Sequence, residues 1–220
     1  MVKVKICGMR NLQDVRAAYG ADAVGFLTEA PASPRNLCPE MIKQLVSQVS
    51  LFTSSVLVVP LKDPLRIGWL VSEIEPHAVQ LHTEISPLDV KRIRHAVPAK
   101  VKLYGLVGVI GKTNPLVQQA LALAKSGLDG LILDTKKQTQ SGGTGEVHDW
   151  TVSRQIRDAV MPLPVILAGG LNTRNVLDAI RVVEPYAVDV SSGVEEGNAK
   201  SREKVLEFLR KVRSHDHKSR

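Results

Sequence analysis

The fold of this chain is indicated first by a short apolar run, Val2-Lys3-Val4-Lys5-Ile6-Cys7-Gly8, which ends in a thiol and a glycine. A helical pattern begins right after it, at Asn11. The run therefore predicts a strand with Cys7 at its carboxyl end, beside a residue that lets the backbone turn. Three later runs end in a similar way: Leu131-Ile132-Leu133-Asp134, Val165-Ile166-Leu167-Ala168-Gly169-Gly170 and Val188-Asp189-Val190-Ser191-Ser192-Gly193. We expect these ends to share one active face.

Further runs of the same kind extend along the whole chain. Strands are predicted near 2–7, 23–27, 54–60, 78–82, 100–109, 130–134, 165–168 and 187–191, in nearly continuous apolar stretches. Such stretches are typical of parallel strands buried on both faces. Helical patterns separate them at 12–19, 40–49, 64–74, 87–96, 115–124, 150–160, 173–183 and 203–212. Ser86, Asn114 and Asp149 precede three of these helices and are the expected caps.

Strand–helix units repeated at this spacing favour an α/β fold with a single closed (β/α)8 barrel, the TIM barrel. The alternative is an open doubly wound sheet, whose glycine-rich first turn is not matched by Cys7-Gly8-Met9-Arg10-Asn11. Long loops such as 28–38 and 135–148 leave strands, as they do on the active face of a barrel. We expect one barrel domain over 1–213, followed by a basic C-terminal tail at 214–220 that is frayed.

Composition limits the classes of function. A chain of 220 residues with 44% hydrophobic residues suits one globular α/β domain. Lys3 and Lys5 interrupt the first apolar run, which argues against a signal peptide and makes the cytoplasm the expected location. Cys7 and Cys38 are the two cysteines, and both should be thiols there. The net charge of +7 suits small anionic substrates better than nucleic acid, because aromatic residues make up only 4% of the chain.

Glycine clusters after the sixth, seventh and eighth predicted strands indicate a phosphate site. Their candidate ligands are Gly143, Gly145, Gly169, Gly170, Ser191, Ser192 and Gly193. Glycine lets a phosphate approach the backbone, where several peptide N–H groups can converge on it. The alternative is that these glycines only form turns. Because the first half of the chain has no matching set, we expect one phosphate rather than two.

Cys7 and Asp134 are the candidate proton-handling groups. A thiolate can act as a general base, although a cysteine on an apolar strand is more often a small buried hydrophobic residue. Burial at the edge of a strand favours the protonated form of Asp134, which a general acid needs. The alternative for Asp134 is a helix-capping or salt-bridging carboxylate.

Three further polar residues are expected to line the same face. Arg35 lies in the long second loop, and its planar guanidinium suits a carboxylate, unless it is an ordinary exposed arginine. His82 closes the fourth predicted strand and could line the site. Asp189, between Val188 and Val190, is expected to be structural or to orient the substrate. No metal-ligand spacing is present among the histidines and cysteines.

These motifs together resemble the phosphoribosylanthranilate isomerase family of tryptophan biosynthesis. The resemblance rests on motifs that run the length of the chain: Lys5-Ile6-Cys7-Gly8, Gly20-Ala21-Asp22-Ala23-Val24-Gly25-Phe26, Ser33-Pro34-Arg35, Val79-Gln80-Leu81-His82, Leu133-Asp134-Thr135, Gly142-Gly143-Thr144-Gly145, Asp149-Trp150, Ala168-Gly169-Gly170-Leu171-Asn172 and Val188-Asp189-Val190-Ser191-Ser192-Gly193-Val194-Glu195. Arg10 and Thr83 depart from the family's commonest pattern.

The resemblance implies a barrel enzyme that carries out an Amadori rearrangement without a redox cofactor or a metal. It implies that Cys7 is the general base, that Asp134 is the general acid, and that Arg35 contacts the anthranilate carboxylate. The phosphate would be held by the loops of units six to eight. The enzyme would be a monomer or a homodimer that acts on a small phosphosugar, with no nucleic acid or membrane partner.

Three other functions stay open at this point. A histidine-pathway sugar isomerase uses the same rearrangement, but it would need a second phosphate site and an aspartate in place of Cys7. A non-catalytic phosphate-binding barrel would show no turnover. A lyase or synthase on a related barrel would carry a different acid–base pair.

Overall fold

The computed structural model describes residues 1–110, 112–135 and 148–218. Its centre is a closed barrel of parallel strands in the order of the sequence. The strands are β1 Lys3–Cys7, β2 Ala23–Leu27, β3 Ser54–Val59, β4 Ala78–Leu81, β5 Lys102–Val109, β6 Gly130–Thr135, β7 Val165–Leu167 and β8 Ala187–Val190. Closure comes from β1 pairing with β8, where Lys5 stands opposite Asp189. The closed (β/α)8 barrel is therefore confirmed, and the open sheet is excluded.

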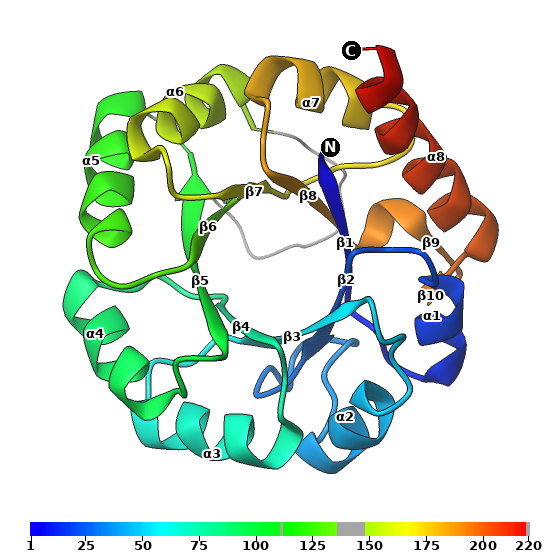
Figure 1. Ribbon diagram of the computed structural model, residues 1–220, viewed down its shortest axis with the longest axis horizontal. Coiled ribbons are helices and arrows are strands. Elements are labelled where there is room, and N and C mark those ends of the chain that lie inside the picture. Colours follow the sequence, from blue (N-terminus) through cyan, green and yellow to red (C-terminus); the bar gives the residue numbers. More distant parts are fainter. Residues whose placement is uncertain (111, 136–147, 219–220) are drawn as a thin grey trace.

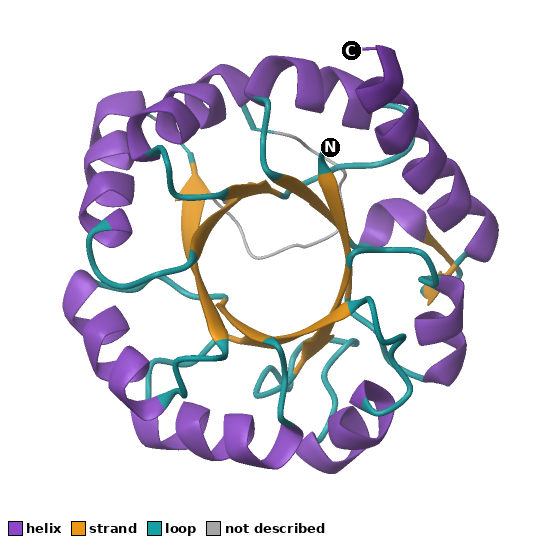
Figure 2. Ribbon diagram, viewed as in Figure 1, coloured by secondary structure: helices purple, strands orange, loops and turns teal. Residues whose placement is uncertain are grey.

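A ring of helices surrounds the barrel, as Figures 1 and 2 show. The helices are α1 Leu12–Ala17, α2 Pro39–Val46, α3 Pro64–Ile74, α4 Pro87–Ala96, α5 Thr113–Ala124, α6 Trp150–Val160, α7 Val176–Val183 and α8 Arg202–Lys218. Ser86 caps α4 with a full capping box, and Asp149 caps α6 by accepting from the backbone of Thr151. The cap expected at Asn114 is wrong, because α5 already begins at Thr113.

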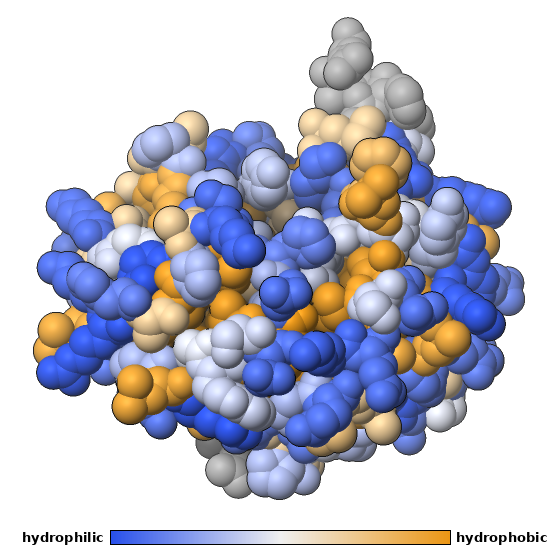
Figure 3. Space-filling model, turned by 60° about the horizontal axis from the view of Figure 1, so that its bottom comes forward, coloured by the Kyte–Doolittle hydropathy of each residue, from blue (hydrophilic) through white to orange (hydrophobic). Residues whose placement is uncertain are grey.

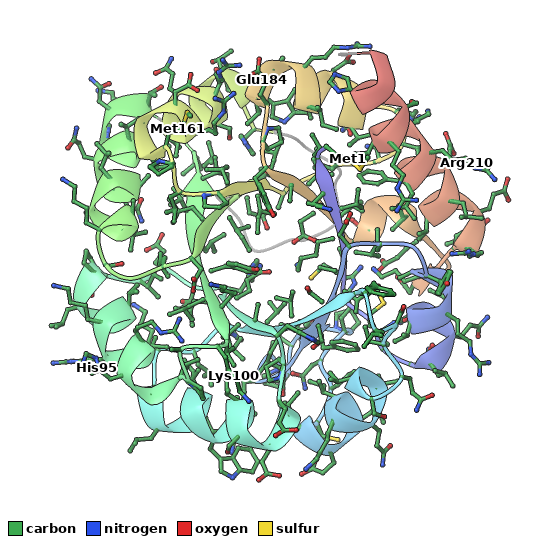
Figure 4. All side chains as sticks on the ribbon, in the orientation of Figure 1. Met1, His95, Lys100, Met161, Glu184 and Arg210 are labelled. Carbon is green, nitrogen blue, oxygen red and sulfur yellow. The ribbon has the colours of Figure 1, made fainter. Side chains whose placement is uncertain are left out.

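The apolar residues form two separate cores. The larger core lies between the barrel and the helices and takes in outward-facing strand residues such as Val4 and Ile6. The smaller core lies in the barrel interior, where Ile132, Ile166, Ala168 and Ala187 meet, with Tyr104 and Leu106 packed against them. Figure 4 shows side chains filling the centre that the ribbon leaves open. Side chains alternate along a strand, so the neighbours of Val4 and Ile6 on β1, which are Lys3, Lys5 and Cys7, face this interior.

A segment that was not predicted from the sequence lies between β8 and α8. A 3-10 turn at Ser192–Val194 leads into a two-stranded hairpin, β9 Glu195–Glu196 and β10 Ala199–Lys200. Gly197 and Asn198 turn the hairpin with positive φ angles of 52° and 65°. The last helix then continues to Lys218, beyond residue 213, where the sequence placed the end of the barrel domain.

The outer face seen in Figure 3 is mostly hydrophilic, with separate hydrophobic spots. Among the helices of the described part of the chain, none is long and apolar enough to cross a membrane.

Candidate active site

A cavity of about 310 Å³ opens at the carboxyl ends of the strands. Its lining includes nine of the residues singled out from the sequence: Cys7, Arg35, His82, Asp134, Gly169, Gly170, Asp189, Ser191 and Ser192. The volume lies at the lower end of the range for small-molecule sites. Residues that are far apart in the sequence meet here because parallel strands in a barrel all end at the same rim.

Cys7 is the last residue of β1, and its thiol lies in a space that a glycine leaves open. A Cβ atom added to Gly25 on β2 would stand 2.8 Å from Cys7 Sγ and 3.2 Å from Lys5 Nζ. Burial raises the pKa of the Cys7 thiol above its ordinary value, and the charge of Lys5 acts in the opposite direction. The thiol therefore lies at the cavity wall beside a cation.

Lys5 and Asp189 form an ion pair inside the barrel. Lys5 Nζ lies 2.7 Å from Asp189 Oδ2, and the two side chains are only 4% and 7% exposed. Burial by itself lowers the pKa of Lys5, but Asp189 and Cys7 more than offset this effect, so the pKa is raised and the ammonium stays charged. The other oxygen of Asp189, Oδ1, is buried and has no hydrogen-bond partner among the described residues.

Asp134 stands near the end of β6 and also lines the cavity. Burial raises the pKa of this carboxyl group; His82 opposes the shift and Asp189 adds to it. A Cβ atom on Gly169 would come within 2.8 Å of Asp134 Oδ1 and 2.2 Å of Thr135 Oγ1. The ends of β6 and β7 can approach this closely only because residue 169 is a glycine, and its φ of +87° also favours glycine.

His82 follows β4 and lies in the same cavity, as the sequence predicted. Its Nδ1 atom lies 3.1 Å from Nε2 of Gln80, whose side chain also lines the cavity. Gln80 Oε1 is buried without a partner in the described part of the chain. Gln80 was not among the site residues expected from the sequence, although its polar side chain in the apolar run of β4 was a usable signal.

Arg35 reaches the cavity from the loop after β2, but it is not free. Its Nε and Nη2 atoms donate to the two oxygens of Glu195 at 2.9 and 2.5 Å. Glu195 also accepts from Lys200, whose side chain is 1% exposed. Burial opposes ionisation of Glu195, yet the hydrogen bonds from Arg35 and Lys200 hold its pKa below the usual range. Sequence reasoning missed Lys200 as part of this network.

The glycines after β7 and the serines and glycine after β8 differ in backbone conformation and in their contacts. Gly169 and Gly170 line the cavity with φ angles of +87° and +64°. Ser191 donates through its hydroxyl to the carbonyl of Cys7 at 3.0 Å, and Ser192 follows it in the cavity wall. Gly193 is pressed against the chain after β7, because a Cβ there would meet the Leu171 carbonyl at 2.0 Å. The expected ligands Gly143 and Gly145 lie outside the described residues.

The sequence comparisons point to one family. Residues 4–211 match the family model described as N-(5'-phosphoribosyl)anthranilate (PRA) isomerase. The chain belongs to this family. A curated N-(5'-phosphoribosyl)anthranilate isomerase of Methanosarcina acetivorans is 39% identical, over 96% of this chain and 93% of that protein. One of Methanocella arvoryzae is 40% identical, over 97% of this chain and 99% of that protein.

Solved structures of the family share the fold. The phosphoribosyl anthranilate isomerase of Thermotoga maritima aligns with a TM-score of 0.84 at 34% identity, over 97% of this chain and all (100%) of that one. A second isomerase structure aligns with a TM-score of 0.79 at 32% identity, over 97% of this chain and 100% of that one. That protein holds reduced 1-(o-carboxyphenylamino)-1-deoxyribulose 5-phosphate. Both likenesses span the barrel as a whole.

Proposed function

We propose that this isomerase converts N-(5'-phosphoribosyl)anthranilate to 1-(2-carboxyphenylamino)-1-deoxyribulose 5-phosphate with Cys7 as general base and Asp134 as general acid. The observation that carries the assignment is that these two half-buried, titratable side chains, from β1 and β6, line one cavity. Membership of the isomerase family supplies the reaction, an Amadori rearrangement of an aminoaldose to an aminoketose.

Two of the proton transfers in this reaction are assigned to Asp134 and Cys7. Asp134 donates a proton to the furanose ring oxygen; the C1–O bond breaks and the nitrogen lone pair forms a Schiff-base cation. The thiolate of Cys7 then removes the proton from C2, and the electron pair of that C–H bond neutralises the cation to give an enolamine. The enolamine gains a proton at C1 and loses one from its hydroxyl group, which yields the ketone. Each assisted transfer is typically worth about 10²–10⁴-fold in rate.

In the reactive state, Cys7 and Asp134 together carry one proton. A cycle begins with Asp134 protonated and Cys7 ionised and leaves the proton on Cys7 instead, so the proton must return before the next turnover. Burial raises the pKa of both groups, which makes the carboxylic acid easier and the thiolate harder to populate. A device that favours the thiolate is therefore needed at Cys7.

Substrate recognition is assigned to the rim of the cavity. Gly169, Gly170 and Ser192 are proposed to hold the phosphate, with Gly143, Gly145, Ser191 and Gly193 as further predicted ligands. Positive φ angles at Gly169 and Gly170 support this assignment, since such turns can aim backbone N–H groups at an anion. Arg35 is proposed to meet the anthranilate carboxylate, with its guanidinium held in place by Glu195. His82 and Asp189 are proposed to contact the sugar between these two ends.

Partners and location follow from the same assignment. The proposed partner is the phosphosugar substrate, without nucleic acid or membrane, in a cytoplasmic monomer or homodimer. Within the described ranges, no cluster of three or more His, Cys, Asp or Glu side chains is placed to hold a metal ion. The two proton transfers assigned to Asp134 and Cys7 use side chains of this chain.

The decisive experiment replaces each member of the pair. Cys7→Ala and Asp134→Ala are expected to lower kcat at least about 100-fold, because each removes one proton transfer. Loss of substrate fluorescence measures turnover, and circular dichroism checks the fold. Cys38→Ser is the matched control, since Cys38 is an exposed thiol outside the cavity. Near-normal turnover in both alanine variants would overturn the acid–base assignment.

A further inference from the structure

The barrel interior contains a cation that the proton-transfer scheme does not use. Lys5 is 3% exposed, and its ammonium is buried directly among polar groups of β1 and β8. Burying a charge is costly unless it is paired, and a lysine in such a place needs a reason. Asp189 supplies the ion pair, but replacing a buried ion pair by well-packed apolar residues is often neutral or stabilising, so the pair is weak evidence for a role in stability.

Lys5 is directed at the thiol by the geometry of its strand. Residues two apart on a strand face the same side, so Lys5 lies one interior layer below Cys7. Both Lys5 Nζ and Cys7 Sγ border the same empty point beside Gly25, at 3.2 and 2.8 Å. The two atoms are therefore within about 6 Å of each other, the range in which an opposite charge favours an ionised group. A Cβ atom at residue 25 would crowd both of them.

We propose that Lys5 is the positioning residue that stabilises the Cys7 thiolate, with Asp189 holding its ammonium in place beneath the sulfur. The inference rests on the proposed role of Cys7 as the base. It gives the buried ion pair a function: Asp189 fixes the ammonium through one oxygen, and the remaining N–H groups of Lys5 are available to the sulfur. Lys5 acts through Cys7 and has no proton transfer of its own.

The other charged groups around Cys7 are less suited to this task. Lys200 on β10 also favours the thiolate, but less than Lys5 does, and it already binds Glu195 and Ser191. Arg35 in the loop after β2 is engaged by Glu195 through two hydrogen bonds. The carboxylate of Asp189 on β8 disfavours the thiolate, and Asp134 is a further acidic group lining the same cavity. Lys5 is thus the main group that opposes the effect of burial on the pKa of the Cys7 thiol.

The test measures the ionisation of the thiol directly. In a Cys38→Ser background, the rate of alkylation of Cys7 by iodoacetamide is followed against pH for the parent protein and for Lys5→Met. The substitution keeps an unbranched side chain that is one atom shorter and removes its charge. The alkylation profile is expected to move to higher pH, with the rate near pH 8 falling at least about tenfold, which corresponds to one pKa unit. The pH profile of kcat should move in the same direction, with little change in KM.

Two further variants serve as a control and as a second test. Lys3→Met removes a cation from the same strand that is 45% exposed and paired with Asp22, and it should leave the Cys7 profile unchanged. Lys5→Met with Asp189→Asn removes the uncompensated carboxylate, so it tests the idea even if the single variant does not fold. The upward shift should persist in this double variant, because Lys5 acts on the thiol more strongly than Asp189 does.

The outcomes separate the two proposals. An unchanged Cys7 alkylation profile in a folded Lys5 variant would overturn the role of Lys5, whatever the turnover. Conversely, full activity of Cys7→Ala would overturn the role of the thiol as base. A shifted profile with a matching shift in kcat supports the inference.

Discussion

At the scale of single residues, the proposed acid–base roles make activity depend on how many protons Cys7 and Asp134 carry together. Burial is the main influence on both groups, and it raises the pKa of each. Because the two side chains line one cavity, their titrations belong to the pair rather than to either residue alone. Only the state with one proton on the pair has both a base and an acid available.

The pH dependence of kcat/KM is therefore expected to be bell-shaped. At low pH both groups are protonated and the base is lost, whereas at high pH both are ionised and the acid is lost. Burial raises the pKa of Cys7 above 9.0 and that of Asp134 above 3.8. The active range should therefore lie between an acid limb and an alkaline limb. Initial rates between about pH 4 and pH 10.5 measure the profile, using standard group ranges as a guide. A profile that is flat across this range would contradict the shared-proton scheme.

At the scale of elements, the hairpin β9–β10 ties two distant loops of the rim together. Lys200 donates to Glu195 and to Ser191, and its backbone N–H donates to Asp14 of α1. Glu195 in turn holds Arg35, whose stem lies against Gly8 so closely that a Cβ there would meet Arg35 Cδ at 2.5 Å. A guanidinium held in this way would lose less entropy on binding the carboxylate proposed for it.

Removing the guanidinium should affect one end of the substrate only. Arg35→Ala is expected to lower kcat/KM about 10- to 150-fold, the equivalent of a charge-assisted contact of roughly 1.5–3 kcal/mol. The inhibition constant for inorganic phosphate should change little, because Gly169 and Gly170, which are proposed to hold the phosphate, follow β7, whereas Arg35 follows β2. Equal losses in both measurements would place Arg35 on the phosphate or in the fold.

Arg66→Ala is the matched control for this prediction. Arg66 also donates through Nε and Nη2 to a glutamate, Glu29, but it lies outside the lining of the cavity. Its replacement should leave both kcat/KM and phosphate inhibition near their parent values.

At the scale of the whole molecule, stability depends on closing the ring of helices as well as the sheet. α8 packs against α7 and α1, the helices on either side of the point where β8 meets β1. Phe208 on α8 is fully buried in the larger core, whereas Arg210 lies on the outside, as its label in Figure 4 shows. α8 thus covers the seam, the junction between the first and the last strand–helix units.

Phe208→Ala is expected to lower the free energy of unfolding by about 3–5 kcal/mol, through lost burial and the cavity left behind. Urea denaturation followed by circular dichroism measures the change. Arg210→Ala on the same helix should shift the free energy of unfolding by no more than about 0.5 kcal/mol. Similar midpoints for the two variants would mean that the seam adds little to stability.

The sequence by itself determined the strand–helix alternation and the placement of the site. Continuous apolar runs predicted the strands to within a few residues, since a parallel strand is buried on both faces whatever its neighbours are. The residues that close those runs, Cys7, His82 and Asp134, were predicted to share a face because all strands of a barrel point the same way. The structure confirms that they line one cavity.

Only the tertiary structure decided the partners of these residues. The pairing of Lys5 with Asp189, of Arg35 with Glu195, and the place of Lys200 depend on contacts between residues far apart in the chain. The hairpin β9–β10 also escaped prediction, because its strands are two residues each and carry no periodicity. Local patterns record whether a side chain is buried, but which charge neutralises it is fixed by the closure of the barrel, which brings β8 against β1.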